Sequence, residues 1–239
     1  MAPGNAYRTA LLKLSGNAFA DRNGRGISEG HVEFICRQIA EGYGVCSQLA
    51  VVVGGGNILR GAVFRPEGHE RLRADYAGMI ATMVNALVLQ DGLERAGVRA
   101  AVYGPWPVAG VVRPFAEEPC RAELQSGRVV ILSGGTGNPL FTTDTGAALR
   151  AVQLGAEIML KATRVEGVYS GDPEKDSKAQ LYERLNYDEV LARRLGVMDM
   201  CAVSLCRDHA LPVRVFNYRT EGNIRRVLAG EQIGTLLGT

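Results

Sequence analysis

Six short apolar runs are spaced along the chain, and each has the composition of a buried strand. They cover residues 9–14, 48–53, 98–103, 128–132, 156–161 and 211–216. Between them lie stretches whose apolar residues recur every three or four positions, as they do on one face of a helix. Strands that alternate with helices are typical of a mostly parallel sheet covered on both faces. The pattern predicts an α/β fold and one continuous domain over residues 1–239.

Two of the helix-like stretches are defined by their apolar positions. The first follows Ser28, a residue type favoured at helix N-caps, and is marked by Val32, Ile35, Cys36 and Ile39. The second is longer and is marked by Leu72, Tyr76, Met79, Ile80, Met83, Val84 and Leu87. We expect the methionine-rich stripe of this longer helix to face the core or another subunit.

A glycine-rich segment, GGTGNPLFTTD at residues 134–144, joins the apolar run 128–132 to a third helix-like stretch at 142–154. Thr142 or Thr143 suits the N-cap of this helix, and Asp144 lies in its first turn, where the helix dipole favours a negative charge. Backbone N–H groups converge at such a junction and suit a phosphate or another anion. An ordinary turn between a strand and a helix has the same composition, so this segment alone leaves both interpretations open.

Three other candidate strands also end in glycine-rich or hydroxyl-rich segments: KLSG at 13–16, GGGNILRG at 54–61 and KATRVEGVYSGDP at 161–173. The carboxyl ends of parallel strands share one edge of the sheet, where ligands of such folds bind. We therefore expect the cations Lys13, Arg60 and Lys161 to gather there beside Asp144. Neither GxxxxGK[ST] nor GxGxxG is present, which disfavours a P-loop NTPase and a dinucleotide dehydrogenase. Backbone amides with separate lysines suffice for phosphoryl transfer.

Composition narrows the function classes further. The chain has 239 residues, 27 basic and 25 acidic, and the net charge of +2 gives no field typical of nucleic-acid binding. No apolar run approaches the ~18 residues of a membrane span, and the N-terminal run is too short for a signal peptide, so a cytoplasmic protein is expected. Five cysteines without a CxxC pair favour reduced thiols. Cys201, Cys206 and His209 fit no zinc spacing, so we expect no metal held by the protein.

The segments LLKLSG, VVVGGGNILRG, RVVILSGGTGNPLFTTD, KATRVEGVYSGDP and RDHALPVRVFN occur in the order and spacing of the bacterial UMP kinases. The chain resembles this branch of the amino-acid-kinase superfamily from Tyr7 to about Leu237. The resemblance implies an αβα sandwich around a mostly parallel sheet, with UMP bound mainly by the N-terminal half and ATP mainly by the C-terminal half. It also implies transfer of the γ-phosphoryl group from ATP to UMP with Mg²⁺, a place in pyrimidine nucleotide synthesis, a homohexamer, and allosteric control with UTP as feedback inhibitor.

The resemblance also assigns site residues. Catalytic roles fall to Lys13, Arg60, Asp144 and Lys161. ATP would be bound by Lys13, Leu14, Ser15, Gly16, Gly56, Arg60, Thr163, Tyr169 and Asp172. UMP would be bound by Gly55, Asp75, Thr136, Gly137, Asn138, Pro139, Leu140, Phe141, Thr142 and Thr143. Among these, Asp75 matches the acid that holds the ribose, and Asp144 matches the aspartate that holds the two lysines.

Other interpretations of these residues stay open. Lys161 suits a strand end, Tyr169 suits a core, and Asp75 suits a solvated helix face, whereas burial of Lys13 without a function would be costly. A related kinase would instead phosphorylate aspartate, glutamate or carbamate, although such acceptors need no acid for a ribose. A non-catalytic oligomeric protein that stores anions or regulates would have no use for Lys13, Asp144 and Lys161 together. Residues 104–125 match the family poorly.

Overall fold

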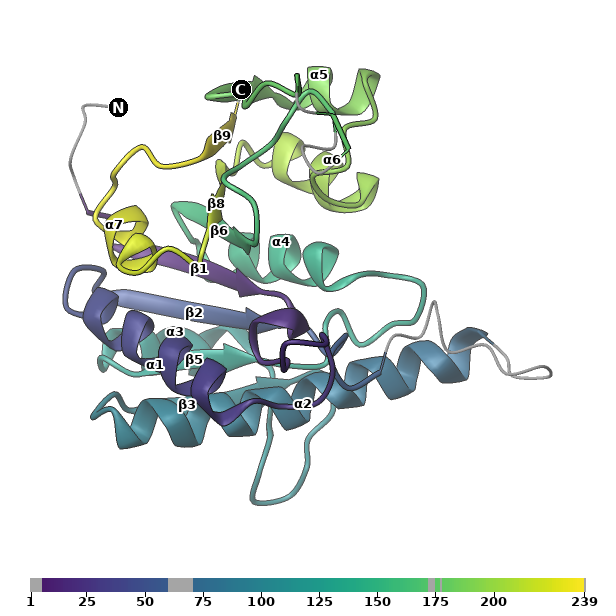
Figure 1. Cartoon of the computed structure of the whole chain (residues 1–239). Coiled ribbons are helices and arrows are strands. Elements are labelled where there is room, and N and C mark those ends of the chain that lie inside the picture. Colours follow the sequence, from purple (N-terminus) through teal and green to yellow (C-terminus); the bar gives the residue numbers. More distant parts are fainter. Residues whose placement is uncertain (1–5, 60–70, 172–174, 177, 239) are drawn as a thin grey trace.

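The computed structural model describes residues 6–59, 71–171, 175–176 and 178–238. Within these residues nine strands form one sheet in the order β4-β3-β5-β2-β1-β6-β8-β9-β7, shown in Figure 1. All neighbouring strands are parallel except β8 and β9, which are antiparallel. The strands are β1 (Thr9–Leu14), β2 (Gln48–Val53), β3 (Ala100–Gly104), β4 (Arg113–Pro114), β5 (Val129–Leu132), β6 (Ile158–Thr163), β7 (Arg184–Asn186), β8 (Val213–Asn217) and β9 (Thr235–Gly238).

Helices cover both faces of this sheet (Figure 1). One face packs against α1 (Glu29–Tyr43), α2 (Arg71–Arg95) and α7 (Asn223–Leu228). The other packs against α3 (Glu117–Gln125), α4 (Thr143–Leu154), α5 (Tyr187–Ala192) and α6 (Met200–Asp208). A short 3₁₀ helix, η1 (Gly16–Ala18), follows β1. Among the described residues, no helix combines the length and apolar character that a membrane span requires.

The predicted mostly parallel α/β arrangement is confirmed. All six predicted strands are present, two of them with identical bounds and four shifted by one or two residues. The pattern missed β4, β7 and β9, which have only two to four residues each. It also assigned nothing to the divergent segment 104–125, which contains β4 and α3. In α3, Cys120 and Leu124 are buried against the sheet.

The three predicted helices are also present. Ser28 is the N-cap of α1, but its side chain makes no capping hydrogen bond. The stripe on α2 divides into two parts, because Met79 and Met83 are buried in the core. Leu87 is partly buried against the same core. The other four members are 41–55% exposed on the outer side of the helix, and they are Leu72, Tyr76, Ile80 and Val84. They lie four residues apart, so they share one helix face.

The alternation of side chains along β1 places a lysine inside the molecule. Leu12 and Leu14 point to the face covered by α1 and α2, whereas Leu11 points to the face covered by α4. Because successive side chains of a strand point to opposite faces, Lys13 shares the face of Leu11. β5, β2, β1 and β6 are adjacent and parallel, so the four glycine-rich or hydroxyl-rich segments follow neighbouring strand ends.

Candidate functional site

Two lysines on adjacent strands share one carboxylate at the carboxyl edge of the sheet. Lys13 of β1 and Lys161 of β6 are directly paired in register. Asp144 in the first turn of α4 lies between them, with Oδ1 at 2.7 Å from the Nζ of Lys13 and Oδ2 at 2.6 Å from the Nζ of Lys161. Each of the three side chains is at most 13% exposed. The predicted grouping of these residues is therefore present in the structure.

The charges of this cluster do not cancel, because two cations share one anion. Burial acts to raise the pKa of Asp144, but Lys13 and Lys161 outweigh it, so the carboxyl titrates below its ordinary value. Burial lowers the pKa of Lys161, and Asp144 opposes this effect. The cluster keeps one net positive charge in a largely dry place, where electrostatic interactions are strong. Such an arrangement suits the negative charge that develops during phosphoryl transfer.

The first turn of α4 is fixed by a side-chain cap. Thr142 is the N-cap, and its hydroxyl accepts hydrogen bonds from the backbone N–H groups of Asp144 at 3.0 Å and Thr145 at 3.5 Å. This confirms Thr142, rather than Thr143, as the cap. The helix ends at Gly155, which adopts a left-handed conformation. Local sequence therefore decides where α4 begins, and hence which residue faces the two lysines.

The KLSG and GGGN segments approach each other so closely that side chains would not fit between them. A Cβ on Gly16 would lie 2.6 Å from the backbone nitrogen of Gly56. Beside this contact, Asn57 of the GGGN segment and Asn85 of α2 form a reciprocal pair of amide hydrogen bonds, at 3.1 and 2.7 Å. The Nδ2 of Asn85 also donates to the carbonyl of Gly54. Both asparagines are at most 4% exposed, so this buried pair holds the glycine backbone in place.

A second buried polar side chain on α2 holds the next glycine segment. The hydroxyl of Thr82 donates to the carbonyl of Met79 and accepts from the backbone N–H of Gly134, both at 2.6 Å. Thr82 and Asn85 are three residues apart and therefore lie on one face of the helix. Through these two residues, α2 is attached to the loops that follow β2 and β5.

On the side of the site that the resemblance assigns to UMP, Asp75 contacts the loop of residues 136–143. Its carboxylate accepts from the Nε of Arg71 and, at 3.0 Å, from the backbone N–H of Leu140. The Asp75 side chain is 12% exposed, so it is not a solvated residue on the outside of the helix. In the same loop, Leu140 and Phe141 are 64% and 49% exposed. The structure brings the predicted ribose ligand and the predicted acceptor loop together.

A cavity of about 400 Å³ lies beyond Lys161 on the C-terminal side. Its lining includes two of the residues predicted to bind adenosine, Thr163 and Tyr169. The Thr163 hydroxyl donates to the carbonyl of Val165 at 2.7 Å, which fixes the chain as it leaves β6. The opposite wall is formed by residues 194–197. The volume lies within the range of small-molecule sites.

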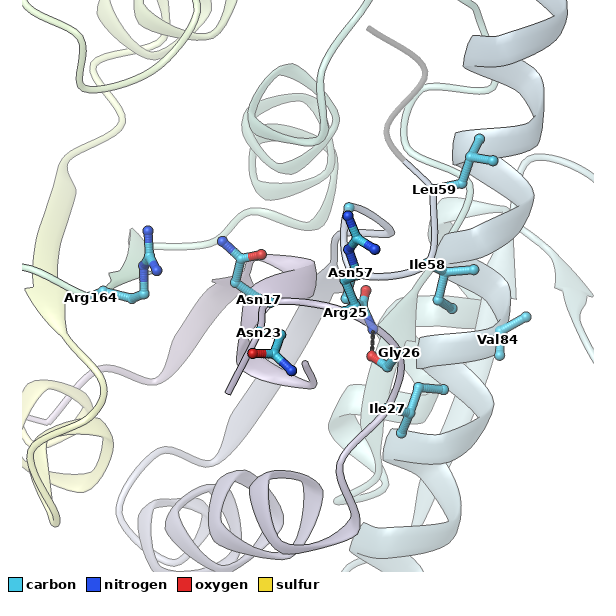
Figure 2. A pocket seen from close by; sticks show the side chains of 12 residues that line it. Asn17, Asn23, Arg25, Gly26, Ile27, Asn57, Ile58, Leu59, Val84 and Arg164 are labelled. Atoms are coloured by element: carbon cyan, nitrogen blue, oxygen red, sulfur yellow. Dashed lines mark hydrogen bonds between the residues drawn. The ribbon is translucent and has the colours of Figure 1, made fainter. Parts of the chain in front are cut away.

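A larger cavity, of about 1030 Å³, opens beside Gly56 and is drawn in Figure 2. The dashed line in Figure 2 marks the hydrogen bond from Asn57 to the carbonyl of Gly26 at 2.8 Å, which attaches the segment after η1 to the GGGN loop. Ile58 and Val84 lie on the α2 side of this cavity, and Arg164 lies on the opposite side (Figure 2).

The remaining predicted site residues fall into two groups. Arg60 and Asp172 lie outside the described residues. Leu14, Ser15, Gly16, Gly55 and Gly56 lie at the ends of β1 and β2, next to the lysine pair. Sequence reasoning missed Thr82 and Asn85, although these two polar residues within the apolar pattern of α2 were a usable signal.

The cysteines form no part of this site. All five are free, and Cys201 alone among them is exposed. Cys206 is buried on α6, where burial raises its pKa to about 12. Within the ranges that the structure describes, no three His, Cys, Asp or Glu residues are grouped as metal ligands.

Comparisons with known proteins agree with this fold. UMP kinase from Bacillus anthracis has a TM-score of 0.93 and 34% identity, covering 98% of this chain and 97% of that one. UMP kinase from Ureaplasma parvum has a TM-score of 0.90 and 29% identity, with both chains fully covered. Uridylate kinase from Archaeoglobus fulgidus has a TM-score of 0.74 and 29% identity, covering 96% of this chain and 100% of that one. These matches confirm the fold that the motifs implied. The model of the amino acid kinase family matches residues 8–217, and the chain belongs to that family.

Proposed function

We propose that this protein is a UMP kinase, which transfers the γ-phosphoryl group of ATP to UMP and yields ADP and UDP. The observation that carries the proposal is the pair of buried lysines bridged by Asp144 at the edge where four glycine-rich or hydroxyl-rich segments meet. The similarity to two bacterial UMP kinases over nearly the whole chain supports UMP as the acceptor. The reaction belongs to cytoplasmic pyrimidine nucleotide synthesis.

Each part of the site has a role in this reaction. The 400 Å³ cavity takes the adenosine of ATP, so that its phosphates extend toward Lys13 and Lys161. Asp75 and the loop of residues 136–143 hold UMP from the other side. The two lysines neutralise charge on the transferring group, and Asp144 holds their ammonium groups in place without touching phosphate. Positioning and charge stabilisation account for most of the catalysis in such transfers.

Mg²⁺ enters this proposal as part of the nucleotide. The described residues supply no cluster of acidic or imidazole ligands, and both oxygens of Asp144 face lysines. This donor set fits an ion that is held by phosphate oxygens and water, as Mg²⁺ commonly is. When bound, the ion would shield the negative charges of the β- and γ-phosphates.

The alternative functions fit the site less well. An enzyme that phosphorylates an amino acid or carbamate has no use for a carboxylate placed against the acceptor loop, as Asp75 is. A protein that only stores anions or regulates has no use for lysines oriented by a buried aspartate. We therefore keep phosphoryl transfer to a nucleotide as the proposed function, in preference to these two alternatives.

The proposed assembly is a homohexamer, and its proposed feedback inhibitor is UTP. The exposed stripe of Leu72, Tyr76, Ile80 and Val84 on α2 supports contact with a second copy, because a continuous apolar face of this kind favours burial. UTP shares its uracil and ribose with UMP and would occupy the same acceptor site.

The proposal is tested by measuring ADP release with UMP, CMP, aspartate, glutamate or carbamate as acceptor. We expect turnover with UMP well above that with any other compound. Lys13→Ala should lower kcat by about 100- to 1000-fold with a small change in KM for ATP, because one charge that stabilises the transition state is lost. Lys178→Ala, at an exposed position, is the matched control. Turnover with the amino acids alone, or an unchanged kcat in Lys13→Ala, contradicts the proposal.

A further inference from the structure

Asp199 connects the first turn of α4 to the start of α6, and none of the roles assigned above includes it. One carboxylate oxygen, Oδ1, accepts from the hydroxyl of Thr145 at 2.7 Å and from the backbone N–H of Ala202 at 3.0 Å. The other, Oδ2, accepts from the hydroxyl of Thr142. Asp199 is thus the N-cap of α6 and, at the same time, the acceptor for two hydroxyls of α4.

The direction of these hydrogen bonds matters for Asp144. The Thr142 hydroxyl has one proton, which it gives to Asp199, so its lone pairs stay free for the backbone N–H groups of Asp144 and Thr145. An ionised carboxylate only accepts, and it therefore forces the hydroxyl into this orientation. Without it, the hydroxyl rotor of the α4 cap has no fixed direction. The position of Asp144 depends on that cap.

The segment before Asp199 reaches the other members of the site. Residues 194–197 form one wall of the 400 Å³ cavity, and the carbonyl of Val197 accepts from the Nζ of Lys161. Val197 and Met198 are buried, so the segment is held firmly against the sheet. A short run of chain therefore links the nucleotide cavity, Lys161 and, through Asp199, the turn that carries Asp144.

We propose that Asp199 is a positioning residue for phosphoryl transfer, which fixes the hydroxyl cap of α4 and thereby aligns Asp144 between Lys13 and Lys161. The inference rests on the proposed function and adds a residue to it. Asp199 does not line the nucleotide cavity. Its loss should therefore disturb the reacting lysines more than it disturbs the binding of adenosine.

Asp199→Asn separates this role from simple helix capping. The amide oxygen can keep both bonds of Oδ1, and Asn is as good an N-cap as Asp, so α6 stays capped. The amide nitrogen replaces Oδ2 and donates to the Thr142 hydroxyl, which leaves the proton of that hydroxyl without its acceptor. We expect kcat with UMP to fall about 10- to 100-fold, with KM for ATP within about threefold of the wild type. Asp188→Asn, at an exposed carboxylate on α5 that pairs with Arg207, is the matched control and should keep kcat.

The pH profile gives a second readout that a loss of packing would not change. The charged groups that face Lys161 are Asp144 from α4, Lys13 from β1 and Asp199 from the start of α6, whereas its neighbour on β8 is Val215. The negative charge of Asp199 acts to raise the pKa of Lys161. Without this charge, Lys161 loses its proton at a lower pH. The alkaline limb of the kcat profile of Asp199→Asn should therefore move to lower pH. A merely loosened structure would lower the plateau and leave that limb in place.

Thr145→Val completes the test, because it removes one of the two hydroxyls and leaves Asp199 intact. Its effect on kcat should be smaller than that of Asp199→Asn, and the double variant should be less impaired than the two separate losses multiplied together. If Asp199→Asn fails to fold, as seen in its thermal unfolding, Thr145→Val alone carries the measurement of kcat and KM. A kcat within twofold of the wild type in the folded variants overturns the role of Asp199. An inactive wild type with UMP overturns the proposed function instead.

Discussion

The carboxylate of Asp75 has a specific environment, which makes its proposed role in reading the ribose testable. UMP and dUMP differ by one hydroxyl donor, and a hydrogen bond to a charged group contributes about 1.5–3 kcal/mol. The wild type should therefore favour UMP over dUMP by about 10- to 150-fold in kcat/KM. Asp75→Asn should weaken UMP more than dUMP and narrow this ratio, while KM for ATP stays nearly unchanged. The measurement is kcat/KM for both acceptors with both proteins.

Arg71→Gln provides the control for Asp75. It removes the guanidinium that pairs with Asp75 but keeps the carboxylate and its bond to the backbone of Leu140. We expect this variant to retain most of the discrimination between UMP and dUMP. An Asp75→Asn enzyme with an unchanged ratio would assign Asp75 to holding the loop of residues 136–143 rather than the ribose.

The lowered pKa of Asp144 predicts how stability depends on pH. Because its pKa is lower in the folded than in the unfolded chain, its contribution is present above about pH 4 and is lost as the pH falls through the native value. Asp144→Asn leaves two buried lysines without their anion, so the free energy of unfolding at pH 7 should fall by about 3–5 kcal/mol. The gap between wild type and variant should narrow toward pH 3.

Urea unfolding at pH 7, 5 and 3 measures this effect. Asp91→Asn is the control, since Asp91 is 71% exposed in its pair with Arg95 and should change stability little at any pH. A constant gap between wild type and Asp144→Asn across the series would mean that the carboxylate titrates normally in the folded protein.

At the level of elements, the sequence predicts the strands and helices that are long enough to show a periodic pattern of apolar residues. All six predicted strands are rich in apolar residues and are found within two residues of their predicted bounds, and four of them contain at least four consecutive apolar or β-branched residues. β4 and β7 are too short to show any period, and their pairing depends on neighbours that are distant in sequence. The same limit applies to the site. Residues within glycine motifs were found, whereas Asn85 and Asp199 act through contacts that only the fold creates.

The packing of α2 on the GGGN loop predicts a sharp response to one methyl group. A Cβ on Gly55 would lie 2.6 Å from the carbonyl oxygen of Gly78 and 2.9 Å from the backbone nitrogen of Thr82. Both are backbone atoms of a helix and cannot move alone, so Gly55→Ala should push α2 away from the loop. We expect a lower melting temperature and at least a tenfold loss of kcat/KM for UMP.

Gly44→Ala is the matched control for that change. Gly44 ends α1 with φ of −68°, and nothing lies within 4 Å of the Cβ that alanine would add. This substitution should leave activity unchanged and stability equal or slightly higher. Equal melting temperatures and kcat/KM values for the two variants would show that the close contact at Gly55 is not needed.

At the level of the whole molecule, strand order explains why residues far apart in sequence act together. β1 lies in the middle of the sheet, between β2 and β6, so its end meets segments from both halves of the chain. α2 extends this arrangement outward. Thr82 and Asn85 on its inner face hold two glycine loops, while the stripe of Leu72, Tyr76, Ile80 and Val84 is exposed on its outer side. A contact between subunits on that stripe would therefore involve the same helix that holds the two glycine loops of the site.

The proposed assembly predicts that a single charge on this stripe changes the oligomeric state. Ile80 is 55% exposed, near the centre of the stripe, and burying a carboxylate there without a partner is unfavourable. Ile80→Asp should lower the molar mass measured by light scattering from that of a hexamer to that of a smaller species, with the fold retained by circular dichroism. Leu181→Asp, at another exposed apolar position outside α2, should keep the mass of the wild type. A wild type that is monomeric at micromolar concentration, or an Ile80→Asp variant of full mass, would exclude this stripe as the contact between subunits.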